Sequence, residues 1–597
     1  MKLPIARVPK RLFGRALLGL VFAPALAASP AATAQVTSVG NPLCPGEDVL
    51  FNPGTGGDIK VPTGFTVSVF ASGLNFPTGI AFRSRGEGAG SGFEVYVLES
   101  GHGLPSRCND EVAWQTQNRP GNPFTPDIVV FDSHANVLRV LGKPTDATTE
   151  TGGTAVFQPH GPAVDIAFEH GLQGGRLFAS DSNQATHAHN GQNNSSRIVT
   201  VDPMTGQVTP FITQLPTGDH PTEQLAFKDG WIYWSQGSTT NSGVVRRDNG
   251  GGANQADIPC QDIVLSNNVF DSGGGVMTSG YSAFGTQRPG ATVAAFEGAS
   301  HHGVCDGAIL RAPLNGANPA DAIEPFSWGY RNGYAIRFAP DDHALKGGLL
   351  VGEDGADERG ARPSYGAPDS LQLARQNDDG TPDYHGWPDR YGFLPTTQAV
   401  FNPIGGPSDD LCVPAANPPS NCSAASLAQI LQEDVPMRNV LAFPPQPITG
   451  PLAIEAADSS FTSIEFVPNS FASGPVKRGA ALYTLEGDFG FSASNGTPEV
   501  GHEIRLINFS NPDDPLALSI SNFARNGSGD QAFISGTPGF NRPLNIRFGP
   551  DGCAWVVDFG AVRDAGQAGT DSKYKVPGDG PLLQIPHTGV IWRICRG

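Results

Sequence analysis

Residues 333–354 read GYAIRFAPDDHALKGGLLVGED, and this stretch has the pattern of a β-hairpin. Its first part alternates in polarity, a turn rich in Pro and Asp follows, and a second apolar run closes it. Apolar residues two apart point to one face of a strand and can be buried together. The stretch therefore predicts two antiparallel strands with one buried side.

The same signal occurs six times along the chain. Each copy has an aliphatic residue, any residue and a phenylalanine, followed by a turn and a second apolar run. The pairs are Ile80/Phe82, Ile166/Phe168, Leu225/Phe227, Ile336/Phe338, Ile464/Phe466 and Ile546/Phe548. A repeated unit too small to bury its own face favours radial stacking. We predict an all-β fold, a six-bladed β-propeller with long loop insertions.

The insertions are expected because most repeats lie farther apart than one four-stranded blade requires. The longest cover residues 240–300 and 395–450. Long loops in compact domains are often lids over a site. The two insertions either decorate the surface or partly cover a functional face.

The repeat also predicts where a site lies. In an antiparallel hairpin, the start of the first strand and the end of the second share one edge. Polar residues stand about seven positions before each repeat phenylalanine: Asn75, the segment 158–160 with His160, His220, Arg331, Ser459 and the pair Asn541/Arg542. We expect these residues on one face of the ring, and the function there.

The N-terminus has the pattern of an export signal. A basic start, an apolar stretch from about Ala16 to Ala28 and the small residues around Thr33 fit a cleaved signal peptide. We therefore predict a signal peptide at 1–34, an irregular mature N-terminus at 35–60 and the propeller at 61–597. The expected location is periplasmic or secreted; an uncleaved anchor is the alternative.

The charge of the chain excludes one class of partner. Removing residues 1–34 takes away five positive charges and no negative one, so the net charge falls from −19 to −24. Such an acidic protein repels polyanions. We expect no nucleic acid partner and no membrane span in the mature protein, whereas small neutral solutes and cations are compatible with it.

Eight cysteines lie beyond the signal, an even number that favours disulfides in an exported protein. Their pairing cannot be deduced from sequence. Cys412 and Cys422 are the simplest pair to suggest, because they share one loop. The spacing typical of a structural zinc site is absent from the sequence.

The segment GDHPTEQLAF, residues 218–227, has the clearest chemical signal. It places His220, beside Asp219, just before the third repeat strand, and histidine suits general base catalysis near neutral pH. Adjacent residues of an extended chain point to opposite sides, so Asp219 either supports His220 or orients the loop backbone.

Several blocks together resemble the soluble quinoprotein glucose/sorbosone dehydrogenases, which depend on pyrroloquinoline quinone (PQQ). In order, they are GDHPTEQLAF, GYRNGYAIRFAPD, GEDGAD, DSLQL and DYHGWP. The resemblance covers roughly residues 60–597, is strongest in the third and fourth repeats, and implies a six-bladed propeller. It implies oxidation of a sugar or related alcohol by hydride transfer to calcium-held PQQ, with an electron acceptor that stays unknown.

The resemblance also implies roles for single residues. His220 matches the catalytic base and Asp219 its support. The pair Arg331 and Asn332 matches residues that contact the cofactor and the reacting oxygens. Gly355 and Ala356 match backbone carbonyls that hold calcium. Arg542 matches an arginine facing the cofactor carboxylates, and His160 takes the place of a cofactor-contacting glutamine.

The chain departs from the family pattern at three further places. Leu544 replaces a second late arginine, and Ser370 replaces an acid expected near calcium. Glu486 lies where the family has a lysine facing the cofactor, and its charge would repel a carboxylate.

Two other functions remain open from the sequence. One is a calcium-dependent, lactonase-like propeller hydrolase in which Glu353, Asp354 or Asp357 ligates the metal through its side chain. The other is a non-catalytic binding module, because propellers carry unrelated functions.

Overall fold

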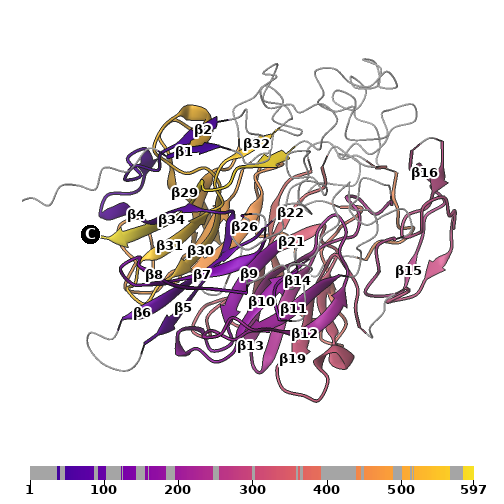
Figure 1. The fold of residues 1–597 in the computed structure, drawn as a ribbon. Coiled ribbons are helices and arrows are strands. Elements are labelled where there is room, and N and C mark those ends of the chain that lie inside the picture. The colour runs from indigo at the N-terminus through magenta and orange to yellow at the C-terminus, as the bar shows by residue number, and fades with distance from the viewer. Residues whose placement is uncertain are drawn as a thin grey trace, which may run out of the picture.

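The computed structural model is a β-propeller drawn in Figure 1. It describes residues 37–40, 48–85, 92–101, 123, 125–142, 155–158, 161–182, 195–245, 255–273, 275–298, 303–357, 361–362, 367–390, 438–445, 450–487, 500–510, 514, 517–564 and 582–597.

Six sheets of four or five strands make up the ring, and the predicted six-bladed propeller is confirmed. Blade one consists of β5 (Pro77–Ser84), β6 (Phe93–Glu99), β7 (Asp127–Asp132) and β8 (Val137–Leu141). Blade two consists of β9 (Ala163–Phe168), β10 (Leu177–Asp181), β11 (Ser196–Val201) and β12 (Val208–Leu215). Blade three consists of β13 (Thr222–Lys228), β14 (Trp231–Gln236), β19 (Ala308–Pro313), β20 (Glu324–Trp328) and the parallel β24 (Asp383–Tyr384).

The remaining blades complete the ring. Blade four consists of β21 (Asn332–Phe338), β22 (Leu349–Asp354), β23 (Ser370–Ala374) and β25 (Ala453–Ile454). Blade five consists of β26 (Phe461–Phe466), β27 (Ala481–Leu485), β28 (Glu503–Phe509), β29 (Leu518–Asn526) and β3 (Ile59–Lys60). Blade six consists of β30 (Pro543–Phe548), β31 (Ala554–Asp558), β34 (Gly589–Arg596) and β4 (Phe65–Leu74).

Short elements decorate this ring. The paired strands are β1 (Thr37–Gly40) with β2 (Asp48–Phe51), β15 (Ile263–Val264) with β18 (Thr292–Val293), β16 (Phe270–Asp271) with β17 (Met277–Thr278), and β32 (Val562–Asp564) with β33 (Leu582–Gln584). The helices are η2 (Gly171–Gln173), η3 (Pro319–Ala322) and α3 (Ala532–Ser535). No helix among the described residues is long and apolar enough to cross a membrane.

Each repeat of the sequence forms the first hairpin of one blade. The first strands of consecutive blades contact one another around the ring, and β30 contacts β5. Closure uses both ends of the propeller, because β4 pairs antiparallel with β34 as the outermost strand of blade six (Figure 1). A strand from the start of the chain thereby holds the last blade in place.

The repeat phenylalanines fill the interfaces between blades. Phe82 of blade one lies with its ring centre 5.2 Å from that of Trp555 in blade six. Phe227 of blade three lies 5.4 Å from Phe178 in blade two. Aromatic rings in such contacts contribute a large buried apolar area. The aliphatic-x-Phe pattern therefore recurs in the sequence because its phenylalanine packs against the neighbouring blade.

The first long insertion packs on blade three. Its strands β15 and β16 lie at the side of the molecule away from the C-terminus (Figure 1). Ile263, Leu265 and Phe270 join the hydrophobic core of this blade, together with Val440 and Leu441 from the second insertion. Most of the second insertion, including Cys412 and Cys422, lies outside the described residues.

Two disulfides are present in the described part of the chain, as the cysteine content predicts. Cys260 pairs with Cys305 and Cys553 pairs with Cys595. The first ties the insertion to the start of β19, and the second ties β34 to the start of β31. Both crosslinks therefore join segments distant in sequence but adjacent in one blade.

We expect replacement of both Cys260 and Cys305 by serine to destabilise blade three by about 3–4 kcal/mol, because the crosslink closes a long loop in the unfolded chain. Chemical denaturation followed by tryptophan fluorescence measures the shift of the unfolding midpoint. An unchanged midpoint would show that the insertion is held by its apolar contacts alone.

Candidate active site

The start of each first strand lies opposite the end of its neighbour, which gathers the predicted polar residues at one edge of the blades. Asn332 pairs with Asp354 in blade four, and Pro543 pairs with Asp558 in blade six. Pro77 pairs with Glu99 in blade one. The edge therefore carries residues from both strands of each hairpin.

His220, Asp219 and Arg331 meet at this edge, between blades three and four. His220 Nε2 lies 3.5 Å from Asp219 Oδ2. Arg331 Nη2 lies 3.1 Å from the same carboxylate oxygen. The side chain of Arg331 is only 4% exposed, whereas that of His220 is 23% exposed and accessible to a ligand. One carboxylate thus joins the histidine to the arginine.

Backbone hydrogen bonds hold this cluster in place. The amides of Asp219 and His220 donate to the carbonyls of Thr239 and Ser238, at 3.0 and 3.1 Å. The amide of Ser238 in turn donates to the carbonyl of Arg331 at 2.8 Å. Gly237 is required here, because a Cβ atom at this position would lie 2.2 Å from His220 Cβ. The segment after β14 therefore aligns His220 with the fourth blade.

The guanidinium of Arg331 also binds two residues of the GEDGAD turn. Nη1 donates to the carbonyl of Gly355 at 2.7 Å, and Nη2 donates to Asp357 Oδ2 at 2.6 Å. The Arg331 amide donates to Glu353 Oε1 at 3.1 Å. A rigid fork of donors is suited to hold several acceptors at once. Arg331 therefore fixes the turn as well as Asp219.

Asn332 connects blade four to blade five through Asp354. Its Nδ2 donates to Asp354 Oδ2 at 3.0 Å, and Asp354 Oδ1 accepts from the amide of Phe461. Asn332 Oδ1 is buried and has no hydrogen-bond partner within the described residues. A buried acceptor without a partner costs about 1–3 kcal/mol. This oxygen is thus available to a ligand or to water.

Glu99 and Asp558, acids at the ends of the second strands of blades one and six, were not among the predicted site residues. Glu99 accepts from the amide of Asn75 at 2.6 Å, and Asp558 accepts from the amides of Asn541 and Arg542, each at 2.8 Å. The sequence did contain a signal for these carboxylates, since most of the second apolar runs end in an acidic residue. These carboxylates hold the polar segments that precede the first strands.

Glu486 occupies the equivalent place in blade five but behaves differently. Glu486 is 8% exposed, and its carboxyl makes no hydrogen bond within the described part of the chain. Burial raises the pKa of Glu486 to about 7; Arg542 opposes this rise and Asp558 adds to it. Arg542 itself is fully buried and donates through Nη1 to the carbonyl of Gly487 at 2.8 Å.

Glu223 is a second carboxyl that sequence reasoning missed. It lies on β13, is 2% exposed, and its Oε1 is 3.8 Å from His220 Nδ1. Burial, followed by the charge of Glu486, raises the pKa of Glu223 well above its usual range. The only sign of it in the sequence is a glutamate within the strand segment TEQLAF, three positions after His220. Glu223 and Glu486 therefore interact across the site.

Tyr334 is affected by the charges of both Glu223 and Glu486. Burial raises the pKa of its hydroxyl, and the charges of Glu223 and Glu486 add to that effect. The phenol thus stays protonated at neutral pH and can donate a hydrogen bond.

The remaining predicted positions lie as follows. Leu544 is buried, and Ser370 Oγ donates to Glu353 at 3.3 Å. Ala356 is buried, and His160 lies outside the described residues. Among the described residues, no group of three or more His, Cys, Asp or Glu side chains is arranged to hold a metal ion.

No protein-family model matches this chain, and no curated protein matches it. Solved structures of related fold do match. The structural neighbours include PQQ-dependent sugar dehydrogenases. The holo form of the pyranose dehydrogenase PQQ domain from Coprinopsis cinerea is 12% identical, with 90% of this chain and 97% of that chain covered and a TM-score of 0.44.

Two further neighbours have comparable values. The PQQ-bound aldose sugar dehydrogenase from Streptomyces coelicolor is 14% identical, with 90% of this chain and 100% of that chain covered and a TM-score of 0.39. A carbohydrate-active enzyme from Trichoderma reesei, in its calcium structure, is 14% identical, with 90% and 97% covered and a TM-score of 0.45.

Proposed function

We propose that this protein is an exported oxidoreductase that oxidises a sugar or related alcohol, with His220 as the base that takes the hydroxyl proton. The observation that carries the proposal is the contact of His220 with Asp219, which Arg331 also binds. The export signal, the disulfides and the sequence resemblance support it. PQQ and calcium are the proposed cofactors, and the electron acceptor of the reduced cofactor is not assigned.

The residues around His220 fit the reacting end of a quinone cofactor. Arg331 supplies positive charge, Tyr334 can donate a hydrogen bond, and Asn332 Nδ2 lies beside them at the same edge. When bound, PQQ would supply an electrophilic carbon that accepts the hydride of the alcohol. The chain supplies what a cofactor cannot: a base beside the substrate hydroxyl and donors fixed in place.

The part of the site around Glu223 and Glu486 fits the cofactor in one protonation state. PQQ is a tricarboxylate. The carboxyls of Glu223 and Glu486, which would lie near it, accept no hydrogen bonds within the described part of the chain. A protonated carboxyl is a donor and pairs with a carboxylate; an ionised one repels it. Because the pKa of Glu486 is raised to about 7, the protonated form is populated at and below neutral pH. The site fits PQQ with a proton on Glu486.

Calcium would be held by backbone carbonyls at the GEDGAD turn. A hard cation takes such oxygens well and can act as a Lewis acid on a quinone. Gly355 contributes a carbonyl that already accepts from Arg331, and its amide donates to Asp369 Oδ1 at 2.8 Å. The turn is therefore rigid, and Ala356 follows it with a further carbonyl.

Within this arrangement, each side chain has a defined task. His220 receives the proton of the substrate hydroxyl, and Asp219, 3.5 Å from Nε2, stabilises the imidazolium that results. Arg331 donates to the carboxylate of Asp219 at 3.1 Å and holds it in position. The partial burial of His220 limits the access of water to the reacting atoms.

Titration of the purified protein with PQQ, in the presence and absence of calcium, tests this function. We expect absorbance changes of bound quinone, followed by dye reduction when an aldose or sorbosone is added. PQQ binding without turnover would favour a binding module. Absence of both binding and turnover would refute the oxidoreductase.

The carboxyls that a metal-dependent hydrolase would need are already engaged by protein donors. Asp357 accepts from Arg331, Asp354 from Asn332, and Glu353 from the amide of Arg331. The Gly355 carbonyl is engaged in the same way, so these contacts do not distinguish the two uses of calcium; the hydrolase is not proposed because no observation specifically favours it.

A further inference from the structure

The segment 238–241, which follows β14, supports both halves of the proposed active site. Its backbone accepts from the amides of residues 219–220 and donates to the carbonyl of Arg331. The side chain of Asn241 also exchanges two hydrogen bonds of 2.9 Å with the backbone of Asp357, which binds Arg331. A displacement of this one segment would therefore move the base and the arginine relative to each other.

The segment packs against the His220 loop without free space between the two backbones. A Cβ atom at Gly218 would lie 2.3 Å from Cα of Thr239, and one at Gly237 would lie 2.2 Å from Cβ of His220. Protein interiors are close-packed, so backbones in such contact shift together. A change in the position of Thr239 is therefore passed on to His220.

Two buried acids hold the segment in place. Asp306 Oδ2 accepts from the amide of Thr239 at 3.0 Å and from its hydroxyl at 2.5 Å. Asp257 accepts from the amide and the hydroxyl of Thr240, at 2.9 and 2.6 Å. Asp306 is 2% exposed and Asp257 is 3% exposed. Each acid thereby binds both donors of one threonine, away from water.

Asp306 also ties the segment to the body of the first long insertion. Its Oδ1 accepts from the amide of Ile258 at 2.7 Å, and its own amide donates to the carbonyl of Ile258 at 3.1 Å. The disulfide between Cys260 and Cys305 crosslinks the same two stretches of chain. The insertion is thus fixed, covalently and by hydrogen bonds, beside the acid that holds Thr239.

We propose that Asp306 is a positioning residue for His220, which acts through Thr239 to fix the base relative to Arg331. The first long insertion then supports the active site and does not only decorate the surface. The link to catalysis rests on the proposed oxidation at His220. The hold on the backbone is inferred from the hydrogen bonds alone, so the two can be tested separately.

Thr239→Val removes the hydroxyl that Asp306 binds and keeps the size of the side chain. We expect faster hydrogen exchange at the amides of Asp219 and His220, measured by mass spectrometry of peptic peptides. Dye reduction should slow by about tenfold, since a misplacement of about 1 Å can cost about 10²-fold in rate. KM for the sugar and affinity for PQQ should change little, because the contacts of Arg331 with the GEDGAD turn remain. Thr239→Ser retains the hydroxyl and should behave as wild type in both measurements.

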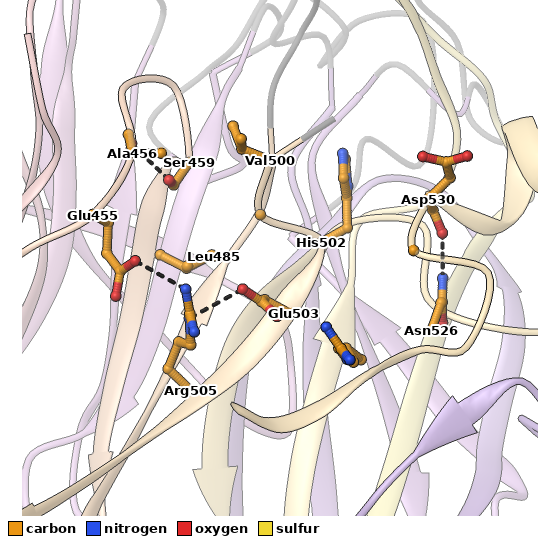
Figure 2. Close-up of a pocket in the computed structure, with 13 residues that line it drawn as sticks. Glu455, Ala456, Ser459, Leu485, Val500, His502, Glu503, Arg505, Asn526 and Asp530 are labelled. Carbon is orange, nitrogen blue, oxygen red and sulfur yellow. Dashed lines mark hydrogen bonds and ion pairs between the residues drawn. The ribbon is translucent and has the colours of Figure 1, made fainter. Parts of the chain in front are cut away.

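Asp306→Asn tests the acid itself. Donors face both of its oxygens, so the NH₂ group of an asparagine would meet a donor of Ile258 or of Thr239. We expect the same two changes as in Thr239→Val but larger, with turnover about 10²-fold lower. Glu503→Gln is the matched control, because it also turns a carboxylate into an amide. Glu503 lines a separate cavity in blade five, where it lies 3.0 Å from Nε of Arg505 (Figure 2), so neither exchange near His220 nor turnover should change.

Thermal unfolding verifies that the variants are folded; if Asp306→Asn is not, the two Thr239 variants decide. Wild-type exchange in Thr239→Val, or an equal loss in Thr239→Ser, would overturn the proposal. Faster exchange in Thr239→Val with full turnover would overturn the link to catalysis. Faster exchange in Thr239→Val, when wild type itself reduces no dye with PQQ, calcium and an aldose, would uphold the hold on the backbone and refute the proposed oxidation.

Discussion

We expect His220→Gln to lose sugar oxidation by a factor of about 10²–10⁴, the usual contribution of a positioned general base. Glutamine keeps the approximate size and polarity of histidine but cannot take a proton. Because the backbone of His220 is held by Ser238, and Gly237 leaves room for its side chain, the substitution should leave the fold unchanged. Single-turnover dye reduction by the PQQ-loaded protein measures the loss.

Two controls separate catalysis from binding in this experiment. His170→Gln changes a histidine that is 62% exposed beside η2, far from the proposed site in the sequence and in the blade, and should retain full activity. PQQ affinity, measured by absorbance, should change little in His220→Gln. Equal turnover in His220→Gln and wild type would contradict the assignment of His220 as the base.

Asp219→Asn provides a related test of positioning. The amide that replaces the carboxylate no longer attracts the positive charge that His220 gains, so we expect a lower turnover with unchanged affinity for PQQ. The pH profile distinguishes this effect from a structural one. A neighbouring carboxylate raises the pKa of a histidine, so its loss should shift the acidic limb of the profile to lower pH. An unshifted profile with normal turnover would show that Asp219 only orients the loop.

PQQ affinity should decrease as pH rises through about 7, because Glu486 then loses its proton. The pKa of this carboxyl is raised by burial, so its neutral form persists to higher pH than that of an ordinary glutamate. Once ionised, it repels a cofactor carboxylate, and unit charges about 4 Å apart interact by about 4 kcal/mol at an effective dielectric constant near 20. Loss of one proton lowers affinity by at most about tenfold per pH unit above the pKa. We therefore expect PQQ affinity to fall by about 30-fold between about pH 6 and 8.5.

Substitution of Glu486 separates its charge from the rest of the site. In Glu486→Gln most of the pH dependence should disappear, and any remainder belongs to Glu223 and Asp558, which interact with the same position. In Glu486→Lys the affinity at about pH 8.5 should exceed that of wild type by about 30-fold or more, because attraction replaces repulsion. A wild-type affinity that is constant over this pH range would show that the cofactor does not approach Glu486.

The repeated hairpin could be predicted from local pattern because it depends on nearest neighbours. Ile336 and Phe338 have the spacing of one strand face, and the turn that follows them lies within the same segment. The same logic placed His220 and Arg331 at one edge, because each precedes a first strand. Burial of an alternating face is a local property of the sequence.

The partners of these residues were not predictable in the same way. The sequence allows two roles for Asp219, and only the structure shows its carboxylate beside both His220 and Arg331. Glu223 carried no local signal beyond a polar residue in an apolar strand. Its contact with His220 and its interaction with Glu486 join blades three and five, which are far apart in the sequence. Such contacts depend on how the blades close.

The sequence by itself determined the number of blades, the edge that carries the polar residues and the chemical types present there, because strand periodicity and hairpin geometry are local. Only the tertiary structure decided which carboxyls are paired and which are not. Asp354 and Asp558 accept backbone hydrogen bonds, whereas Glu486, at the corresponding place in blade five, accepts none within the described residues. The amide that reaches Asp354 comes from Phe461 in blade five, and those that reach Asp558 come from the segment before the first strand of its own blade, so tertiary packing and not local pattern supplies the donors.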